Sequence, residues 1–256
     1  MNVDYAGQTN TGLVRGKNED SYLLGQVAGD HILLVADGIG GRPGGEIASR
    51  LAVDTVFRSM QSGSSLLNAI QSANTAVYLG KPIAMGTTIV GAHIKGDRIT
   101  LGHLGDSRAY CLRDGVLYVL TRDHTPVGRK GGSAHSNMLL KAVGIEKSVE
   151  PTMAKHVMKS GDWYVLCSDG LYTEVNADSM ASILTSSPKS ESAANSLVDL
   201  AVENGGRDNV TASRTCRTPP KRREGVNHPA LMAKHNETKE KMMVQILARF
   251  LTWSSS

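Results

Sequence analysis

The chain has 256 residues, of which 40% are hydrophobic and 20% are charged. This composition is typical of a soluble globular protein and excludes a disordered or low-complexity chain. Its three cysteines, Cys111, Cys167 and Cys216, are widely spaced and odd in number, which argues against a disulfide framework and for a reducing compartment. No run reaches the roughly 18 apolar residues of a membrane span, and the first residues lack a signal-peptide pattern. We therefore expect a cytoplasmic protein without a membrane span.

Positive charge is concentrated near the end of the sequence. The net charge is +4, and residues 213–256 hold nine Lys or Arg against three Asp or Glu. The remainder of the chain is mildly acidic, so the basic character belongs to this last segment alone. We therefore expect the main domain not to bind nucleic acid.

The first half of the sequence predicts a buried strand, two helices and two hairpins. Apolar runs rich in β-branched residues indicate the strands, Gly-containing turns indicate the hairpins, and apolar residues at helical spacing indicate the helices. In chain order the expected elements are a strand at 31–36, helices at 44–60 and 66–78, a hairpin of 87–94 with 98–104, and a hairpin of 108–112 with 116–120.

The second half predicts a buried strand at 163–167 and helices at 180–184 and 193–202. Strands and helices do not alternate strictly along the chain. This order favours an α+β domain with mostly antiparallel sheets over a doubly wound parallel sheet.

Acidic residues recur beside glycine at the predicted ends of strands and turns. Hard cations such as Mg²⁺ and Mn²⁺ prefer oxygen ligands, and a neighbouring glycine lets the backbone approach an ion closely. Two ions about 3.5–4 Å apart can hold a phosphate and generate a nucleophile from water, while Arg15 could bind the phosphate through two hydrogen bonds. The acidic residues are Glu19, Asp20, Asp37, Asp106, Asp169 and Asp208.

Two other interpretations of these motifs are weaker. Asp and Gly favour turns for steric reasons, so any single Asp-Gly pair is best interpreted as a turn, whereas the whole set indicates a shared site. Cys216 and Arg222 have the spacing of a thiol phosphatase, but Pro219 and Pro220 remove N–H donors that such a phosphate loop needs. We interpret that spacing as coincidence, and His124 as a structural loop residue.

Six segments together resemble the PPM-type (protein phosphatase 2C-like) serine/threonine phosphatases, in particular the compact bacterial members. The match runs from about Asp4 to Thr211. The resemblance implies an α+β fold, a layered α-β-β-α sandwich whose two central antiparallel sheets are flanked by helices. In chain order the segments are Gly-Leu-Val-Arg-Gly-Lys-Asn-Glu-Asp, Ala-Asp-Gly-Ile-Gly-Gly, Met-Gly-Thr-Thr, Leu-Gly-Asp-Ser-Arg-Ala-Tyr, Cys-Ser-Asp-Gly-Leu and Gly-Gly-Arg-Asp-Asn-Val-Thr.

The resemblance also implies which residues carry the reaction. Asp37 matches the residue that bridges two metals, and the carbonyl of Gly38 matches a ligand of one of them. Asp169 and Asp208 match the residues that complete the first metal site. With Asp37 they are the candidate catalytic residues, and two or three Mn²⁺ or Mg²⁺ ions would activate water without a covalent phosphoenzyme.

The remaining matched residues have supporting roles in the family. Glu19 matches a metal ligand that acts largely through water, and Asp20 matches a residue that supports the ligands from behind. Asp106, shared with Asp169, matches a third and weaker metal site of bacterial relatives. Arg15 matches the phosphate-binding arginine.

Three departures from the family pattern stand out. Arg42 occupies a position that is usually histidine, and the stretch 125–138 is shorter than the usual flap. Residues 212–215 lack the apolar pattern of the family's last strand, so we expect that strand to be lost. We therefore expect a phosphatase domain at 1–211 and an atypical, partly disordered basic segment at 212–256, which a frameshift or replacement could have produced.

These observations predict a metal-dependent hydrolase of phosphoserine and phosphothreonine in proteins, acting in signalling opposite a bacterial-type kinase. A dedicated regulatory protein is an alternative substrate. A catalytically weak phosphoprotein-binding module of the same fold is an alternative function, favoured by the loss of the last strand. The apolar residues 242–253 could dock on a partner or membrane surface, or remain partly folded.

Overall fold

The computed structural model describes residues 3–39, 44–80, 85–126, 138–187 and 189–217. The chain divides into a compact unit, Met1–Pro219, and a second unit, Pro220–Ser256, and all described residues belong to the first. The expectations for Arg42, for most of the shortened flap and for the segment from 218 onward therefore fall outside the described residues.

Two five-stranded antiparallel sheets form the centre of the first unit. This arrangement confirms the α+β sandwich that was predicted from the sequence. In spatial order, the first sheet contains β1 (Val3–Asn10), β10 (Val210–Arg217), β9 (Trp163–Cys167), β6 (Arg108–Arg113) and β7 (Val116–Val119). The second contains β2 (Asp20–Val27), β3 (Asp30–Asp37), β4 (Ile89–Lys95), β5 (Arg98–Leu104) and β8 (Thr152–Val157).

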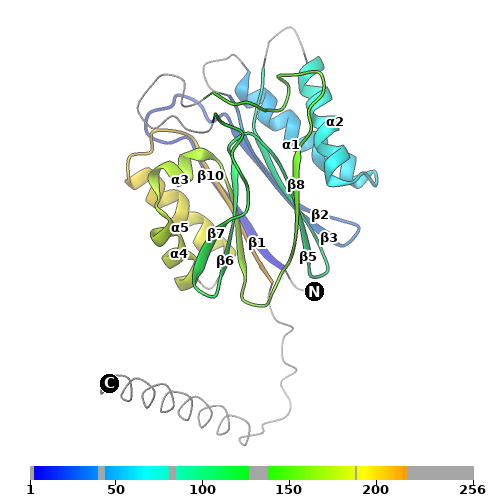
Figure 1. Ribbon diagram of the computed structural model, residues 1–256. Coiled ribbons are helices and arrows are strands. Elements are labelled where there is room, and N and C mark those ends of the chain that lie inside the picture. Colours follow the sequence, from blue (N-terminus) through cyan, green and yellow to red (C-terminus); the bar gives the residue numbers. More distant parts are fainter. Residues whose placement is uncertain (1–2, 40–43, 81–84, 127–137, 188, 218–256) are drawn as a thin grey trace, which may run out of the picture. The chain divides into compact units, whose positions relative to one another are not determined.

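Helices cover the outer faces of both sheets (Figure 1). Helices α1 (Gly45–Gln61) and α2 (Leu66–Leu79) pack on the second sheet. Helices α3 (Asp169–Glu174), α4 (Ala177–Ser186) and α5 (Ser190–Glu203) pack on the first. Among the described helices, none combines the length and the apolar character that a membrane crossing requires.

Strand β3 shows why its sequence is apolar throughout. Successive side chains of a strand point to opposite faces of the sheet. Ile32, Leu34 and Ala36 belong to the core beneath α1 and α2, whereas Leu33 and Val35 belong to the core between the two sheets. Both faces of β3 are therefore buried, which holds its last residue firmly at the end of the sheet.

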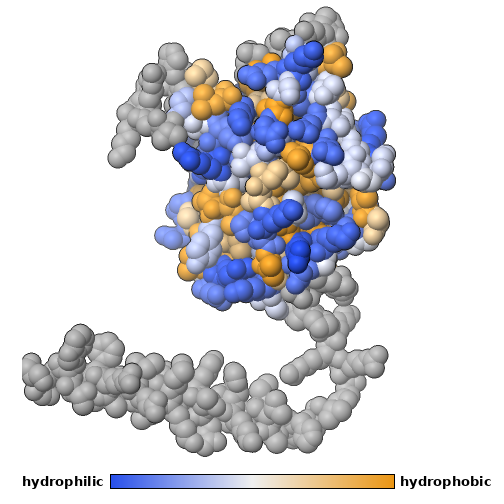
Figure 2. All heavy atoms as spheres, turned by 45° about the vertical axis from the view of Figure 1, so that its right-hand side comes forward, coloured by the Kyte–Doolittle hydropathy of each residue, from blue (hydrophilic) through white to orange (hydrophobic). Residues whose placement is uncertain are grey.

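Hydrophilic residues predominate on the face of the molecule seen in Figure 2, with hydrophobic residues interspersed among them. The two predicted hairpins form as β4 with β5 and β6 with β7, and the predicted strand 163–167 is β9. Strands β1, β2 and β8 were not predicted, since their half-buried residues do not form clear apolar runs.

The expectation that no strand follows Thr211 is wrong. Strand β10 lies between β1 and β9 and pairs with both. Its backbone forms hydrogen-bonded ladders with both neighbouring strands, and these bonds do not depend on apolar side chains. In addition, β-branched residues such as Thr215 are favoured in strands. The compact unit consequently continues past the predicted boundary, to Pro219. Because the last strand is present, the argument that its loss would favour a catalytically weak protein no longer holds.

Arg214 explains why this strand was hard to predict. Its side chain is fully buried within β10. The guanidinium donates hydrogen bonds to the carbonyls of Leu184, Ser187 and Lys189 at distances of 3.0, 3.1 and 2.6 Å, and it lies 3.4 Å above the ring of Trp163. The carbonyl end of α4 carries partial negative charge that favours a cation there.

Candidate metal centre

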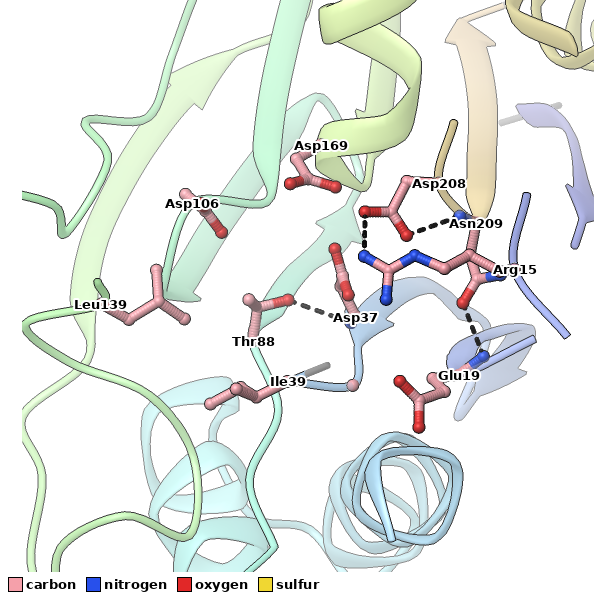
Figure 3. A pocket seen from close by; sticks show the side chains of 11 residues that line it. Arg15, Glu19, Asp37, Ile39, Thr88, Asp106, Leu139, Asp169, Asp208 and Asn209 are labelled. Carbon is pink, nitrogen blue, oxygen red and sulfur yellow. Dashed lines mark hydrogen bonds and ion pairs between the residues drawn. The ribbon is translucent and has the colours of Figure 1, made fainter. Parts of the chain in front are cut away.

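The predicted site residues meet in one pocket of about 160 Å³ at the end of the sandwich (Figure 3). Seven of the residues that line it were predicted from the sequence: Arg15, Glu19, Asp37, Gly38, Asp106, Asp169 and Asp208. Ile39, Thr88, Leu139 and Asn209 complete the lining. Five carboxylates from segments far apart in the sequence therefore converge on one place.

Asp37 stands at the centre of this arrangement because it ends the buried strand β3. Its backbone N–H donates to Thr88 Oγ1 at 3.0 Å, and its carbonyl accepts from the Thr88 N–H at 2.8 Å and from Thr87 Oγ1 at 2.8 Å. Asp20, the first residue of β2, is its cross-strand partner. The carboxylate of Asp37 is therefore held on a rigid backbone.

Two glycines let the loops of the pocket approach one another. A Cβ on Gly38 would lie 2.5 Å from the backbone of Gly45, and a Cβ on Gly170 would lie 2.1 Å from the carbonyl oxygen of Asn209. Neither position can hold a side chain. The absence of a side chain at Gly170 brings the start of α3, with Asp169, against the loop that carries Asp208.

Asp208 lies in the loop between α5 and β10. Its Oδ2 accepts a 2.7 Å hydrogen bond from the guanidinium of Arg15, and its Oδ1 accepts from the Asn209 N–H at 2.8 Å. The Arg15 side chain remains 42% exposed. The guanidinium therefore reaches both the acidic pocket and solvent, as a group that captures an anion must.

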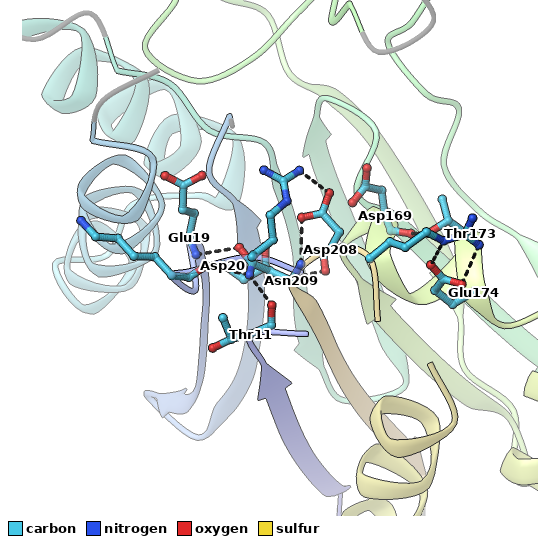
Figure 4. Close-up of polar contacts among 12 residues, drawn as sticks. Thr11, Glu19, Asp20, Asp169, Thr173, Glu174, Asp208 and Asn209 are labelled. Carbon is cyan, nitrogen blue, oxygen red and sulfur yellow. Dashed lines mark hydrogen bonds and ion pairs between the residues drawn. The ribbon is translucent and has the colours of Figure 1, made fainter. Parts of the chain in front are cut away.

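Asn209 organises the loop that carries Arg15 and Glu19, and its role was not predicted. Its side-chain oxygen accepts from the Glu19 N–H at 2.8 Å, and its amide nitrogen donates to the carbonyls of Thr11 and Lys17, each at 2.8 Å (Figure 4). The only signal in the sequence was its position directly after Asp208.

Asp20 lies behind the pocket rather than in its lining, as expected. Its Oδ2 accepts a 2.7 Å hydrogen bond from Ser168, whose hydroxyl also accepts from the Thr211 N–H at 3.0 Å. Its Oδ1 is buried and has no hydrogen-bond partner among the described residues. Burying a charged carboxylate oxygen without a hydrogen-bond donor is energetically unfavourable unless a positive charge lies nearby.

The raised pKa values of the pocket carboxylates also indicate that negative charge is unfavourable there without cations. Burial, and then the charges of Asp20 and Asp169, raise the pKa of Asp37 well above its ordinary value. Burial raises the pKa of Asp20 to about 7, and burial together with the charge of Asp169 raises that of Asp106 to about 6. Burial and the charge of Asp208 also raise the pKa of Asp169. The carboxylates repel one another unless protons or cations bind among them.

The donor set fits Mg²⁺ or Mn²⁺. Neither His nor Cys is among the described residues that line the pocket, and hard cations prefer oxygen. Asp37 and Asp169 both line the pocket, so their carboxylates face the same space. Within the described part of the chain, no group of three His, Cys, Asp or Glu side chains is arranged to hold an ion by itself. The role of each residue as a metal ligand therefore stays a prediction.

The weaker candidates do not form sites. Cys216 is buried within β10, so its thiol is not in a phosphate-binding loop, and Arg222 falls outside the described residues. His124 is held in the loop after β7. Its Nδ1 accepts from the Gly105 N–H at 3.1 Å, and its Nε2 lies 2.9 Å from Thr152 Oγ1.

Comparison with known proteins identifies the family. The family model for protein phosphatase 2C matches residues 14–201. The serine/threonine protein phosphatase PstP of Mycobacterium tuberculosis is 37% identical over 229 residues, which are 81% of this chain and 43% of PstP. This chain thus spans less than half the length of that relative. The serine/threonine phosphatase stp of Listeria monocytogenes is 31% identical over 231 residues, which are 80% of this chain and 92% of the relative.

Solved structures agree with the sequence relatives. The catalytic domain of PstP in complex with two manganese ions superposes with a TM-score of 0.75 at 33% identity, covering 85% of this chain and 99% of that domain. The Streptococcus agalactiae serine/threonine phosphatase gives a TM-score of 0.76 at 28% identity, covering 84% of this chain and 99% of that one. Fold, pocket and sequence together show that the chain belongs to the protein phosphatase 2C family.

Proposed function

We propose that this protein hydrolyses phosphoserine and phosphothreonine in other proteins, using Mn²⁺ or Mg²⁺ held in the acidic pocket. The convergence of five carboxylates on one pocket with an arginine at its rim carries this proposal. The names of the bacterial relatives and the two manganese ions in the PstP structure support it.

Each residue of the pocket then has a task. Asp37, Asp169 and Asp208, with the Gly38 carbonyl and Glu19, would hold two ions, and Asp106 with Asp169 would hold a third and weaker one. When bound, such ions lower the pKa of water to near neutrality and offset the charge of the phosphoryl group.

Arg15 would bind the phosphate. Its guanidinium can leave Asp208, because an ion pair exposed to this degree contributes little stability. A phosphate offers the same geometry to the guanidinium and more negative charge. Because the substrate is a phosphoprotein, we extend the proposal to a serine/threonine kinase that supplies it and to action in the cytoplasm.

A phosphopeptide turnover assay tests the function. The wild type should release phosphate with Mn²⁺ and stop when EDTA is added. Asp37→Asn should lower the rate by more than about 100-fold. Even a residue that only supports a metal ligand typically contributes 10–100-fold to metal affinity or activity. The matched control is Asp199→Asn, because Asp199 is exposed on α5 and does not line the pocket.

Two results would count against this function. Equal activity in EDTA would exclude the metal centre as the source of catalysis. The binding module would be favoured instead if the folded wild type bound the phosphopeptide but released no phosphate with either Mn²⁺ or Mg²⁺.

A further inference from the structure

The turn that carries Asp106 joins the two sheets. Strand β5 ends at Leu104 in the second sheet, and β6 begins at Arg108 in the first. Asp169, by contrast, is the first residue of α3, which packs on the first sheet. In Figure 3 the two carboxylates lie on the same side of the pocket. Their separation therefore depends on where this turn sits relative to α3.

Contacts hold both ends of the turn. The N–H of Gly105 donates to His124 Nδ1 at 3.1 Å, and its carbonyl accepts from the His124 N–H at 3.0 Å. Ser107 Oγ and Thr88 Oγ1 lie 2.6 Å apart. These contacts tie the turn to the loop after β7 and to the segment before β4. The β6–β9 ladder adds a third tie, because it pairs Arg108 with Cys167, two residues before Asp169.

Tyr172 adds a direct contact between α3 and Asp106 itself. Its hydroxyl donates a 3.1 Å hydrogen bond to the backbone carbonyl of Asp106. Tyr172 follows Asp169 by three positions in α3, and residues three apart lie on the same face of a helix. One short helix thus carries Asp169 and, through Tyr172, holds the backbone of Asp106.

The ring of Tyr172 is itself fixed. The guanidinium of Arg108 lies 3.7 Å from the centre of the ring. Asp123 holds that guanidinium by accepting hydrogen bonds of 2.9 Å from Nε and 2.7 Å from Nη2. A backbone carbonyl can only accept, so the Tyr172 hydroxyl is the donor of its hydrogen bond to Asp106. A clamped ring gives the hydroxyl a defined position.

We propose that Tyr172 is a positioning residue that sets the separation of the Asp106 and Asp169 carboxylates and thereby the affinity for the cation they would share. This inference rests on the proposed function. Tyr172 touches no reacting atom; it acts through the backbone of Asp106. Loss of its hydroxyl should weaken binding of that cation while leaving the ions held by Asp37 and Asp208 in place.

Calorimetric titration of the full chain with Mn²⁺, without substrate, tests the proposal. Tyr172→Phe keeps the ring beneath Arg108 and removes only the hydroxyl. It should weaken the weakest class of Mn²⁺ site by roughly tenfold, as loss of a partner behind a ligand typically does, and leave the tighter class unchanged. Tyr110→Phe is the matched control, because its hydroxyl accepts a 3.2 Å hydrogen bond from the same Arg108.

Two further measurements separate positioning from a general structural role. In EDTA, Tyr172→Phe and Tyr110→Phe should unfold at the same temperature. In an Asp106→Asn background, Tyr172→Phe should change Mn²⁺ binding no further, because a residue that acts through Asp106 has nothing left to position.

Three results would overturn the inference. These are a wild-type titration for Tyr172→Phe, an equal loss for Tyr110→Phe, or uniform weakening of all sites together with lower stability in EDTA. A wild type that takes up no Mn²⁺ would instead refute the proposed function, and this inference with it.

Discussion

The side chain of Asn209 accepts a 2.8 Å hydrogen bond from the backbone N–H of Glu19. Glu19 and Asp208 are both candidate metal ligands. Asn209, which directly follows Asp208 in the sequence, thus holds the backbone of Glu19 in place. The same side chain donates to the carbonyls of Thr11 and Lys17. The loop that carries Arg15 is therefore anchored to the end of the α5–β10 connection, which carries Asp208.

Asn209→Ala should weaken Mn²⁺ binding by about tenfold, because the supporting contacts of a metal ligand typically contribute 10–100-fold. Removing its three side-chain hydrogen bonds should also lower stability by about 1–3 kcal/mol. Mn²⁺ titration and thermal unfolding measure both effects. Asn204→Ala is the control, because its amide donates to the Glu174 carbonyl outside the pocket. Unchanged Mn²⁺ affinity in Asn209→Ala would refute the anchoring role.

Arg15→Lys should raise the KM for a phosphopeptide by about tenfold and lower kcat much less. Lysine keeps the positive charge but loses the planar pair of donors, and one charge-assisted hydrogen bond contributes about 1.5–3 kcal/mol. Steady-state kinetics separate the two constants. Arg207→Lys should leave both unchanged, because the exposed Arg207 side chain pairs with Glu174, which does not line the pocket. A loss confined to kcat would show that Arg15 acts on the reaction rather than on binding.

The metal-free protein should become less stable as the pH rises from about 4 to about 7. The folded-state pKa of Asp20 is about 7 and that of Asp106 about 6, both above the ordinary value of 3.8. Between these values the folded state binds more protons than the unfolded state, so the free energy of unfolding falls with rising pH. Thermal unfolding in EDTA across this range measures the slope.

Mn²⁺ should reverse that trend, because the cation competes with protons for the same carboxylates. Asp37→Asn should flatten the slope in EDTA and raise the unfolding temperature there, since it removes one of the repelling acids. An unfolding temperature that rises with pH in EDTA would mean that these carboxylates are already neutralised by contacts within the protein.

Local sequence patterns predicted the pocket well because its residues sit at the ends of recognisable elements. Asp37 follows a run that is buried on both faces, and Asp169 follows another. An aspartate at such a position is held by the strand before it, so its location follows from short-range pattern alone. The family resemblance then supplied the pairing between distant segments.

Two features escaped prediction because they depend on partners far along the chain. The role of Asn209 requires the loop around Lys17 to lie beside it. Likewise, Arg214 is unfavourable in a central strand until α4 supplies the carbonyls of Leu184 and Ser187. No pattern within residues 212–215 indicates those acceptors.

Strand β10 nevertheless carries polar groups that its surroundings do not satisfy. Within the described structure, the buried Oγ of Ser213 and Oγ1 of Thr215 have no hydrogen-bond partner. Thr9 on β1 provides the contrast, because its hydroxyl lies 2.7 Å from Oγ1 of Thr211 on β10. An unsatisfied buried hydroxyl costs about 1–3 kcal/mol, whereas a made hydrogen bond contributes about 1 kcal/mol.

Thr215→Val should therefore stabilise the protein by about 1 kcal/mol, because valine keeps the branched shape and removes the hydroxyl. Thr9→Val should destabilise it by at least a similar amount, because the Thr9 hydroxyl also accepts a 2.9 Å hydrogen bond from the Asn18 amide. Thermal unfolding should show shifts of about 2–4 °C in opposite directions. If Thr215→Val unfolded at a lower temperature, its hydroxyl would have a partner in solution, and β10 would owe its place in the sheet to side-chain hydrogen bonds as well as to its backbone ladders.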